Sequence, residues 1–373
     1  MKKIAVFTGT RAEYGLMKVL IKTLNKSNEF DLYLLISSTH LNPKFGNTID
    51  EIKNDGIDSK YMLPIFVDTN RKKDMSFQTA EVIKLVSSSL EQIKPEFLIV
   101  LGDRFESFGA ASAAHLMGVK VIHLHGGETT LGALDDKLRH SITQLSTIHF
   151  TSADIHKKKV ENMIGTSKNV YNIGPMVIDG LLNLKSISKE DFTCQTGFNF
   201  SKRNFLITFH PETLSENYGI SGFENLLKVL KDCDCNILFT APNADIGSKL
   251  IMKLIEKFVS ANKNRSYFIP SLGQKLYLNA LLLFDCVVGN SSSGMVEAPL
   301  LKTKVLNIGN RQQGRKRFGP VIDVNNDLDS ISRAVGDILG NKKNLGLNVE
   351  DFKEIYAEES PTNKIIKIIN DNF

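Results

Sequence analysis

Short apolar runs alternate with amphipathic helical patterns along most of the chain, and this alternation limits the possible folds more than any other feature. In the first half, strand-length apolar runs occupy residues 3–7, 32–36, 97–101, 120–124, 148–151 and 170–173. Amphipathic helical patterns lie between them, for example at residues 16–24 and 79–93. Strands and helices that alternate at this spacing predict a mostly parallel β-sheet with helices on both faces.

The same pattern starts again in the second half, where strands are predicted at residues 204–209, 236–240, 266–269, 284–288 and 304–308. Residues 185–202 lie between the two halves. Because they are polar and irregular, we interpret them as a linker. The chain has 373 residues, which is too long for one ordinary hydrophobic core.

We therefore predict an α/β protein with two Rossmann-like domains that face each other across a cleft. The first domain is expected at residues 1–184 and the second at residues 203–355. A C-terminal helix within residues 356–373 is expected to pack back on the first domain.

Polar clusters follow five of the predicted strands, on both halves of the chain. They are TGTRAEYG at residues 8–15, GDR at 102–104, HLHGGE at 123–128, HPET at 210–213 and GNSSSG at 289–294. In open α/β sheets, ligands bind beyond the carboxyl ends of the strands. Five such clusters are hard to attribute to turn formation alone, and they predict a ligand-binding site.

The serine cluster belongs to the stretch FDCVVGNSSSGMVEAP at residues 284–299, which reads as a strand, a turn of small residues and the start of a helix. Backbone N–H groups and the helix dipole make such a turn suitable for an anion. Ser291, Ser292 and Ser293 add hydroxyl donors, and Glu297 could accept from ribose hydroxyls. The alternative is a serine N-cap with a capping glutamate. The arginines of NIGNRQQGR, at residues 307–315 just past the next strand, favour the anion site.

The familiar cofactor motifs are missing from the sequence. Residues 8–15 lack G-x-G-x-x-G and no P-loop is present, which disfavours nicotinamide and ATP. His123 and His125 would point the same way in a strand, but His123 is expected to lie too deep, and no third ligand has suitable spacing for a metal. We expect no metal and no cofactor.

The bulk properties are those of a globular protein that binds an anionic small molecule. The net charge of +5 is dispersed, so no nucleic-acid partner is implied. No apolar run approaches the roughly 20 residues that span a bilayer, and the N-terminus reads as a first strand instead of a signal peptide. The four cysteines match neither a zinc pattern nor a disulfide framework. We expect a cytoplasmic homo-oligomer, either a dimer or a tetramer, with no membrane partner.

The motifs GTRAEYG, LGDR, HLHGGE with a following DDxxRH, FHPET, GNSSSGMVE and GNRQQGR occur in order within residues 1–323. In these motifs the chain resembles the UDP-N-acetylglucosamine 2-epimerases, most of all the hydrolysing type of bacterial sialic-acid biosynthesis. The resemblance implies a GT-B-like fold with the site between two Rossmann-like domains, the second of which binds UDP. It also implies a UDP-sugar substrate, with N-acetylmannosamine and UDP as products.

The chemistry of this family follows from the stereochemistry of the substrate. In the chair of UDP-α-N-acetylglucosamine, the axial C1–O and C2–H bonds are antiperiplanar, so UDP can leave as the C2 proton is removed. Water then adds to the resulting 2-acetamidoglucal. These steps need a carboxylate near C2, stabilisation of the departing diphosphate and a second acid/base group.

The resemblance implies that the catalytic candidates are Asp103, Glu128, Asp135, His210 and His125. Other roles exist for the acids: Asp103 could be a helix N-cap, Glu128 a solvated loop acid, and Asp135 could form salt bridges one turn along its helix. Some relatives carry a catalytic glutamate where this chain has His125. Either Glu128 or His125 therefore takes the second acid/base role.

The resemblance also implies a set of UDP-binding residues, which are Arg11, Arg104, His210, Tyr277, Ser291, Ser292, Glu297 and Arg311. Within this set, Glu297 is expected on the ribose and Tyr277, in a loop at residues 269–277, near uracil. Tyr277 could also be a core aromatic. His210 could protonate the leaving phosphate, because a histidine titrates near neutral pH.

Three alternatives remain. The same chemistry could act on a UDP-2,4-diacetamido-trideoxyhexose for legionaminic-type acids, because the motifs mostly hold UDP. A GT-B glycosyltransferase would instead need an acceptor to release UDP. A non-catalytic UDP-sugar sensor would bind tightly without turnover, but the acids at the strand ends argue against it.

Overall fold

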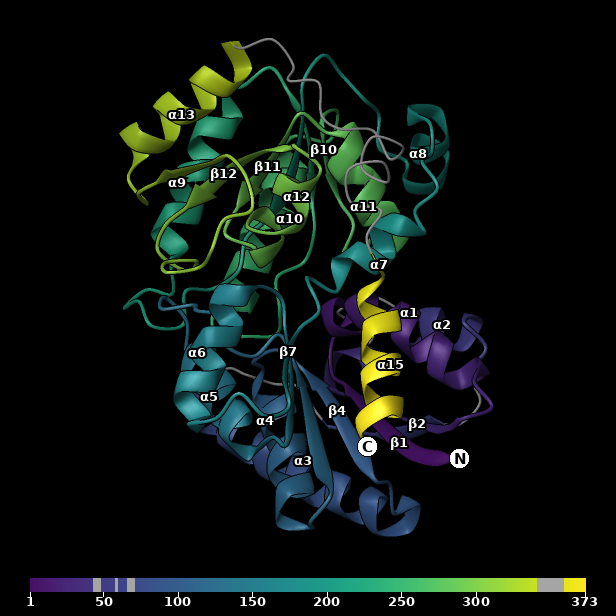
Figure 1. The fold of residues 1–373 in the computed structure, drawn as a ribbon. Helices are drawn as coiled ribbons and strands as arrows, with labels where there is room; N and C mark the ends of the chain where they lie inside the picture. The colour runs from purple at the N-terminus through teal and green to yellow at the C-terminus, as the bar shows by residue number, and fades with distance from the viewer. Residues whose placement is uncertain (43–47, 58–59, 66–70, 341–358) are drawn as a thin grey trace. The chain divides into compact units, whose positions relative to one another are not determined.

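The computed structural model describes residues 1–42, 48–57, 60–65, 71–340 and 359–373. The described residues form two compact units (Figure 1). The first unit comprises those within 1–128, 135–183 and 359–373, and the second comprises 129–134 and 184–340. The boundary predicted near residues 355 and 356 lies outside the described residues.

In the first unit, the described residues form a seven-stranded parallel sheet in the order β3-β2-β1-β4-β5-β6-β7. The strands are β1 (Lys2–Thr8), β2 (Phe30–Ser37), β3 (Lys60–Leu63), β4 (Phe97–Leu101), β5 (Lys120–Leu124), β6 (Ile148–Thr151) and β7 (Val170–Asn172). Every strand predicted here is confirmed. β3 was not predicted: it is a four-residue edge strand in which only Leu63 is buried, and its apolar run is just three residues long.

Helices cover both faces of this sheet. They are α1 (Arg11–Lys26), α2 (Thr48–Asn54), α3 (Lys72–Ile93), α4 (Phe105–Leu116), α5 (Asp135–Leu145), α6 (Asp154–Ile164), α7 (Val177–Leu182) and α15 (Pro361–Asn372), with a 3-10 turn η1 (Ser38–Leu41). Alternate residues of β1 supply the two cores: Ile4 and Val6 pack with α1 and α15, whereas Ala5 and Phe7 pack with α3 and α4. Fully burying such side chains contributes about 1.5–3 kcal/mol each.

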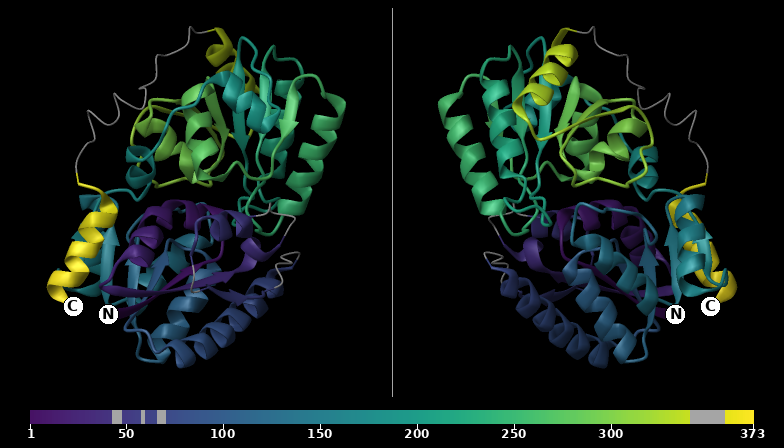
Figure 2. Two further views of the ribbon diagram at one scale, coloured as in Figure 1. Left: turned by 90° about the vertical axis from the view of Figure 1, so that its right-hand side faces the viewer. Right: turned by 90° about the vertical axis from the view of Figure 1, so that its left-hand side faces the viewer.

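The C-terminal helix α15 completes the first unit. It lies against α1 and α7 (yellow in Figure 2), and the Lys2 ammonium donates to the Ile369 carbonyl at 3.0 Å. The buried carboxylate of Asp179 in α7 accepts from the backbone N–H of Thr362 at 3.1 Å and from its hydroxyl at 2.5 Å. Asp179 also accepts from Ser360, the N-cap of the helix. One acidic side chain therefore satisfies the start of α15.

In the second unit, the described residues form a six-stranded parallel sheet in the order β10-β9-β8-β11-β12-β13. The strands are β8 (Asn204–Thr208), β9 (Asn236–Phe239), β10 (Ser266–Phe268), β11 (Cys286–Gly289), β12 (Lys304–Ile308) and β13 (Val321–Val324). This is the Rossmann strand order, and it places the switch point, where ligands bind, between β8 and β11. β13 was not predicted because it is an edge strand with no buried residue.

The helices of the second unit are α8 (Lys189–Thr196), α9 (Ile220–Lys231), α10 (Ser248–Ala261), α11 (Gly273–Leu283), α12 (Glu297–Leu300) and α13 (Leu328–Gly340), with a 3-10 turn η3 (Ser292–Gly294). α9, α10 and α13 bury their apolar faces against β8 and its neighbours. Among the described helices of both units, none is long and apolar enough to cross a bilayer.

The linker prediction for residues 185–202 is wrong. α8 lies in this stretch, begins at the N-cap Ser188 and buries Phe192 completely. The rings of Phe192 and Phe198 pack against Phe284, with centroids 5.8 and 4.8 Å away. The polar residues between the phenylalanines hid a packed aromatic cluster, so this stretch belongs to the second unit.

Residues 129–134 also differ from the prediction, which placed them in the first domain. They pack within the second unit, where the Leu131 N–H donates to the Gln313 carbonyl at 2.9 Å and the Leu134 N–H donates to Thr213 Oγ1 at 3.0 Å. The chain therefore leaves the first unit directly after Glu128 and returns to it at Asp135.

A buried carboxylate shapes the turn between β1 and α1. Glu13 Oε2 accepts from the backbone N–H groups of Gly9 and Thr10 at 2.8 and 2.9 Å, and the Thr10 hydroxyl accepts from the Glu13 N–H. This reciprocal pair is a capping box. The Ser107 hydroxyl donates to Glu13 Oε1 at 2.9 Å. Burial, followed by the nearby charge of Glu106, raises the pKa of Glu13 to about 7.

We predict that Glu13 makes the fold less stable as the pH rises. Its pKa is higher in the folded protein than the ordinary value of 4.5, so its stabilising contribution is complete below about pH 4.5 and is lost as the pH passes about 7. Glu13→Gln should therefore be more stable than the wild type at pH 8 by about 1–3 kcal/mol, and the difference should shrink at pH 5. Urea unfolding at both pH values measures this. Glu96→Gln, at an exposed position, is the control, and an equal pH dependence in all three proteins would contradict the prediction.

Candidate active site

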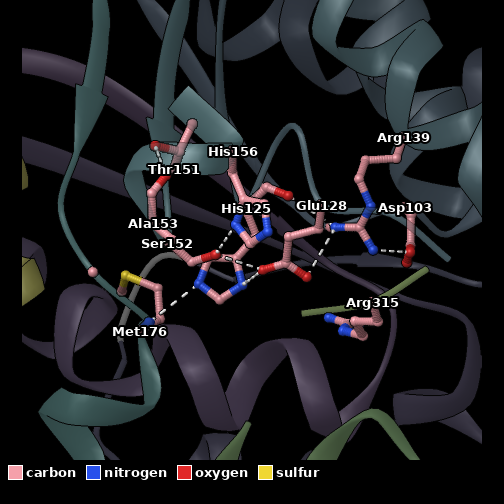
Figure 3. Close-up of polar contacts among 12 residues, drawn as sticks. Asp103, His125, Glu128, Arg139, Thr151, Ser152, Ala153, His156, Met176 and Arg315 are labelled. Carbon is pink, nitrogen blue, oxygen red and sulfur yellow. Dashed lines mark hydrogen bonds and ion pairs between the residues drawn. The ribbon is translucent and has the colours of Figure 1, made fainter. Parts of the chain in front are cut away.

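A buried guanidinium lies beside two acidic candidates of the first unit, Asp103 and Glu128 (Figure 3). The Arg139 side chain is 3% exposed and forms an ion pair with Asp103. Its Nη1 donates to the His125 carbonyl at 2.8 Å and lies 3.7 Å from Glu128 Oε2. Burial opposes the charge of Arg139, but the carboxylates of Asp103 and Glu128, with smaller contributions from Asp135 and Asp136, hold its pKa above the ordinary value.

The ends of two neighbouring strands place these groups. Asp103 follows β4 through Gly102, and His125 follows β5. The N-cap of α4 is Arg104, so the alternative role of Asp103 as a helix cap is wrong. The Asp103 carboxylate instead turns toward Arg139, which lies on α5.

His125 has an unusual backbone and a fixed tautomer. Its φ of 63° lies in the left-handed region, so His125 does not continue β5, and the strand geometry that predicted a shared direction with His123 does not apply to it. Its Nε2 accepts from the backbone N–H of Met176 at 3.1 Å. The ring proton is therefore assigned to Nδ1, which lies 3.2 Å from Glu128 Oε1 and donates to it.

Glu128 receives a second donor from Ser152, which lies between β6 and α6. The Ser152 hydroxyl donates to Glu128 Oε1 at 2.7 Å, and Ser152 Oγ lies 2.9 Å from Nδ1 of His156, which completes a chain of hydrogen bonds. Glu128 is buried, so the alternative role as a solvated loop acid is wrong. Ser152 and His156 were missed, although Ser152 directly follows β6, and the strand-end argument could have found it.

His123 lies deep, as predicted. Its Nε2 is 2.8 Å from the Gly102 carbonyl and its Nδ1 is 3.2 Å from the Thr143 hydroxyl, and burial lowers its pKa to about 3. Within the described residues, no group of three His, Cys, Asp or Glu side chains is arranged to hold a metal ion.

The other candidates of the first unit lie at helix starts. Asp135 and Arg11 are the first residues of α5 and α1, and both are partly exposed. One turn along α5, His140 Nε2 lies 3.5 Å from the carboxylate of Asp136. Arg104 is buried, and its Nε lies 3.1 Å from Glu106 Oε2, so the structure gives this proposed UDP ligand an internal partner.

In the second unit, Asn290 joins the ends of β8 and β11. Its amide binds the backbone of His210 in both directions, accepting from the N–H at 2.7 Å and donating to the carbonyl at 2.8 Å. The Asn290 carbonyl accepts from Arg311 Nη1 at 3.2 Å and from Gln312 Nε2 at 2.8 Å. His210 and Arg311, far apart in sequence, are thus held by one residue at the switch point.

The ring of His210 is also fixed. Its Nδ1 accepts from the backbone N–H of Asn243 at 3.0 Å, which assigns the proton of the neutral ring to Nε2. His210 therefore presents a donor at Nε2, which is the atom that could act on a phosphate oxygen.

The serine turn differs from the expected strand, turn and helix. The 3-10 turn η3 follows Ser291, and α12 is only four residues long. A helix from Gly294 cannot continue because Pro299 has no N–H to donate. The helix dipole therefore contributes little here, and hydroxyl and backbone donors remain. Ser291 and Ser292 are partly exposed, as is Glu297 on α12.

Tyr277 lies in a helix and not in the predicted loop, because α11 already begins at Gly273. Its hydroxyl donates to Ser293 Oγ at 2.6 Å. This contact ties α11 to the serine turn and occupies the buried one of the three serines.

Comparison with known proteins places the chain in a family. The family model described as UDP-N-acetylglucosamine 2-epimerase matches residues 22–370. The chain is 34% identical to a GDP/UDP-N,N'-diacetylbacillosamine 2-epimerase (hydrolyzing) from Campylobacter jejuni over 88% of this chain and 86% of that protein. It is 33% identical to the polysialic acid biosynthesis protein P7 from Escherichia coli over 100% of this chain and 94% of that protein.

Solved structures show the same fold. The UDP-GlcNAc 2-epimerase from Neisseria meningitidis bound to UDP-GlcNAc superposes with a TM-score of 0.76 at 20% identity, over 100% of both chains. The enzyme from Methanocaldococcus jannaschii in complex with UDP-GlcNAc and UDP gives 0.78 at 17% identity, over 99% of this chain and 100% of that chain. The prediction of two Rossmann-like, GT-B-like domains is thereby confirmed. Since the family model spans nearly the whole chain and two relatives exceed 30% identity, this protein belongs to the UDP-N-acetylglucosamine 2-epimerase family.

Proposed function

We propose that the protein is a hydrolysing 2-epimerase that converts UDP-N-acetylglucosamine and water into N-acetylmannosamine and UDP, for the biosynthesis of sialic acid. The observation that carries this proposal is the arrangement of the partly exposed Asp103 and the buried Glu128 and His125 around the buried Arg139. It gathers acid/base groups at the carboxyl edge of a Rossmann-like sheet. The hydrolysing and polysialic-acid relatives support the same reading.

In the first step, the C2 proton passes to a carboxylate as the C1–O bond breaks, and UDP leaves with the bonding electron pair. C2–H is a poor acid, so C1–O cleavage leads and positive charge develops on the ring. A neighbouring carboxylate stabilises that charge. His210 donates to the departing diphosphate from Nε2, and Arg11, Arg311, Ser291 and Ser292 bind its oxygens.

In the second step, water adds to C1 of 2-acetamidoglucal and a proton returns to C2 from the opposite face. Loss and return on opposite faces require more than one acid/base group. Asp103, Glu128 and Asp135 supply them. We leave Arg104, Tyr277 and Glu297 as proposed UDP contacts, with Glu297 on the ribose and Tyr277 near uracil.

We assign the second acid/base role to Glu128 and a positioning role to His125. A proton added to Nε2 of His125 would face the Met176 N–H and break that hydrogen bond, while Nδ1 already donates to Glu128. Both ring nitrogens of His125 therefore already have hydrogen-bond partners. The carboxylate of Glu128, oriented by His125 and Ser152, is the group that can gain and lose a proton.

A specific observation favours a second substrate, a UDP-2,4-diacetamido-trideoxyhexose. Two relatives, at 34% and 30% identity, are named for diacetylbacillosamine. The chemistry would be unchanged. Supplying each nucleotide sugar separately and comparing kcat/KM would decide between them. The cytoplasmic location and the homo-oligomeric state are predictions that belong to this proposal.

We predict that N-acetylmannosamine formed in D2O carries deuterium at C2, because elimination removes the C2 proton and solvent returns one. Proton NMR of the product measures this directly. A glycosyltransferase, or an enzyme that merely hydrolyses the nucleotide sugar, would leave C2–H untouched. Product that retains its C2 proton would therefore rule out the proposed mechanism.

We also predict that substitutions of Glu128 and of His125, which contact each other, lower kcat to different extents. Glu128→Gln and Asp103→Asn should each lower kcat by roughly 10² or more, with UDP binding largely kept. His125→Asn should lower kcat by only about tenfold and leave the shape of the pH–rate profile unchanged, since Asn tolerates a left-handed backbone. His115→Asn, at an exposed site, is the matched control. A nearly silent Glu128→Gln with an inactive His125→Asn would transfer the role to His125.

A further inference from the structure

Residues 129–134, here called the bridging segment, lie on the loop that carries Arg311. The Leu131 N–H donates to the Gln313 carbonyl at 2.9 Å, and Arg315 Nη1 donates to the Thr130 hydroxyl at 3.4 Å. At the far end, the Leu134 N–H donates to Thr213 Oγ1 at 3.0 Å. All these contacts lie within the second unit.

Gly132 permits a close approach between the backbones of the segment and the loop. A Cβ at this position would overlap the Asn310 carbonyl oxygen and would lie 2.7 Å from Arg311 Cα. Both neighbours are backbone atoms, so no side chain can rotate away. The backbone of Gly132 has no unusual φ that would itself require glycine. The constraint at this position is therefore the contact with the Arg311 loop.

The loop is the fixed partner in this contact. The Asn310 N–H donates to the buried Glu212 carboxylate at 3.2 Å, and Arg311 and Gln312 both donate to the Asn290 carbonyl. Gln312 is completely buried. The bridging segment, in contrast, leaves Leu131 54% and Leu134 39% exposed. If the two backbones were forced apart, the segment would move and the loop would stay.

The bridging segment connects two of the proposed catalytic residues along the chain. Glu128 immediately precedes it and Asp135 immediately follows it. We propose that the bridging segment, seated through Gly132, holds Glu128 and Asp135 in their reactive positions and couples them to the diphosphate-binding Arg311 loop. The inference rests on the proposed function, and it makes the segment a positioning element.

The test compares Gly132→Ala with Gly336→Ala, whose added Cβ in α13 would meet no atom within 4 Å. Gly132→Ala should lower kcat by about 100-fold, a loss typical of misplaced catalytic groups. Its affinity for UDP, measured by calorimetry, should stay within about threefold of wild type. Gly336→Ala should match wild type in both. Thr213→Val, which removes only the acceptor for Leu134, is a milder second variant and should lower kcat by about tenfold.

Amide hydrogen exchange supplies a readout that does not depend on turnover. In wild type, saturating UDP should slow exchange in the peptide that contains Leu131, because ligand on the Arg311 loop should favour the seated segment, in which the Leu131 N–H donates to the Gln313 carbonyl. In Gly132→Ala, UDP should bind without slowing that exchange. Two outcomes would overturn the coupling alone. One is a kcat of Gly132→Ala equal to that of wild type, and the other is UDP binding to wild type with no change in amide exchange at Leu131. Failure of UDP to bind wild type would overturn the proposed function and the coupling together.

Discussion

The arrangement of the first unit's catalytic candidates depends on one buried positive charge. Taking a guanidinium out of water costs several kcal/mol unless carboxylates and carbonyls surround it. Arg139 meets this requirement with Asp103, Glu128 and the His125 carbonyl. The dependence runs both ways, because carboxylates gathered in one place would repel one another without the cation. Arg139 thus allows acidic side chains to stand close together, which is what the two proton transfers of the proposed mechanism require.

The fold was largely predictable because buried parallel strands are continuous apolar runs, and the strands missed, β3 and β13, are partly exposed edges. Asp103 and Glu128 could be found because polar residues at strand ends line ligand sites. Contacts between distant parts of the chain produce two features that were not predicted. They are the hydrogen bond between His125 and Met176 and the place of residues 129–134 in the second unit. No local pattern reports these. α8 was missed because its buried phenylalanines are scattered among polar residues.

Family membership is firmer than substrate identity for a physical reason. The motifs that carry the resemblance are mostly proposed to bind the diphosphate, the ribose and the base, which all UDP-sugars share. The two relatives above 30% identity accordingly carry names that point to different sugars. Residues that contact C4 and C6 of the hexose would discriminate between substrates. Motifs that bind UDP do not identify those residues.

The first unit is built from both ends of the described chain, and this has a consequence for synthesis on the ribosome. Its core includes Ile365 and Ile369 of α15, whereas residues 184–340 of the second unit are contiguous. At the usual rates of translation, α15 emerges on the order of ten seconds or more after β7. During that interval the nascent sheet lacks the helix that packs beside α1, and its apolar residues stay open to chaperones. The second unit can finish folding first, although it is encoded later.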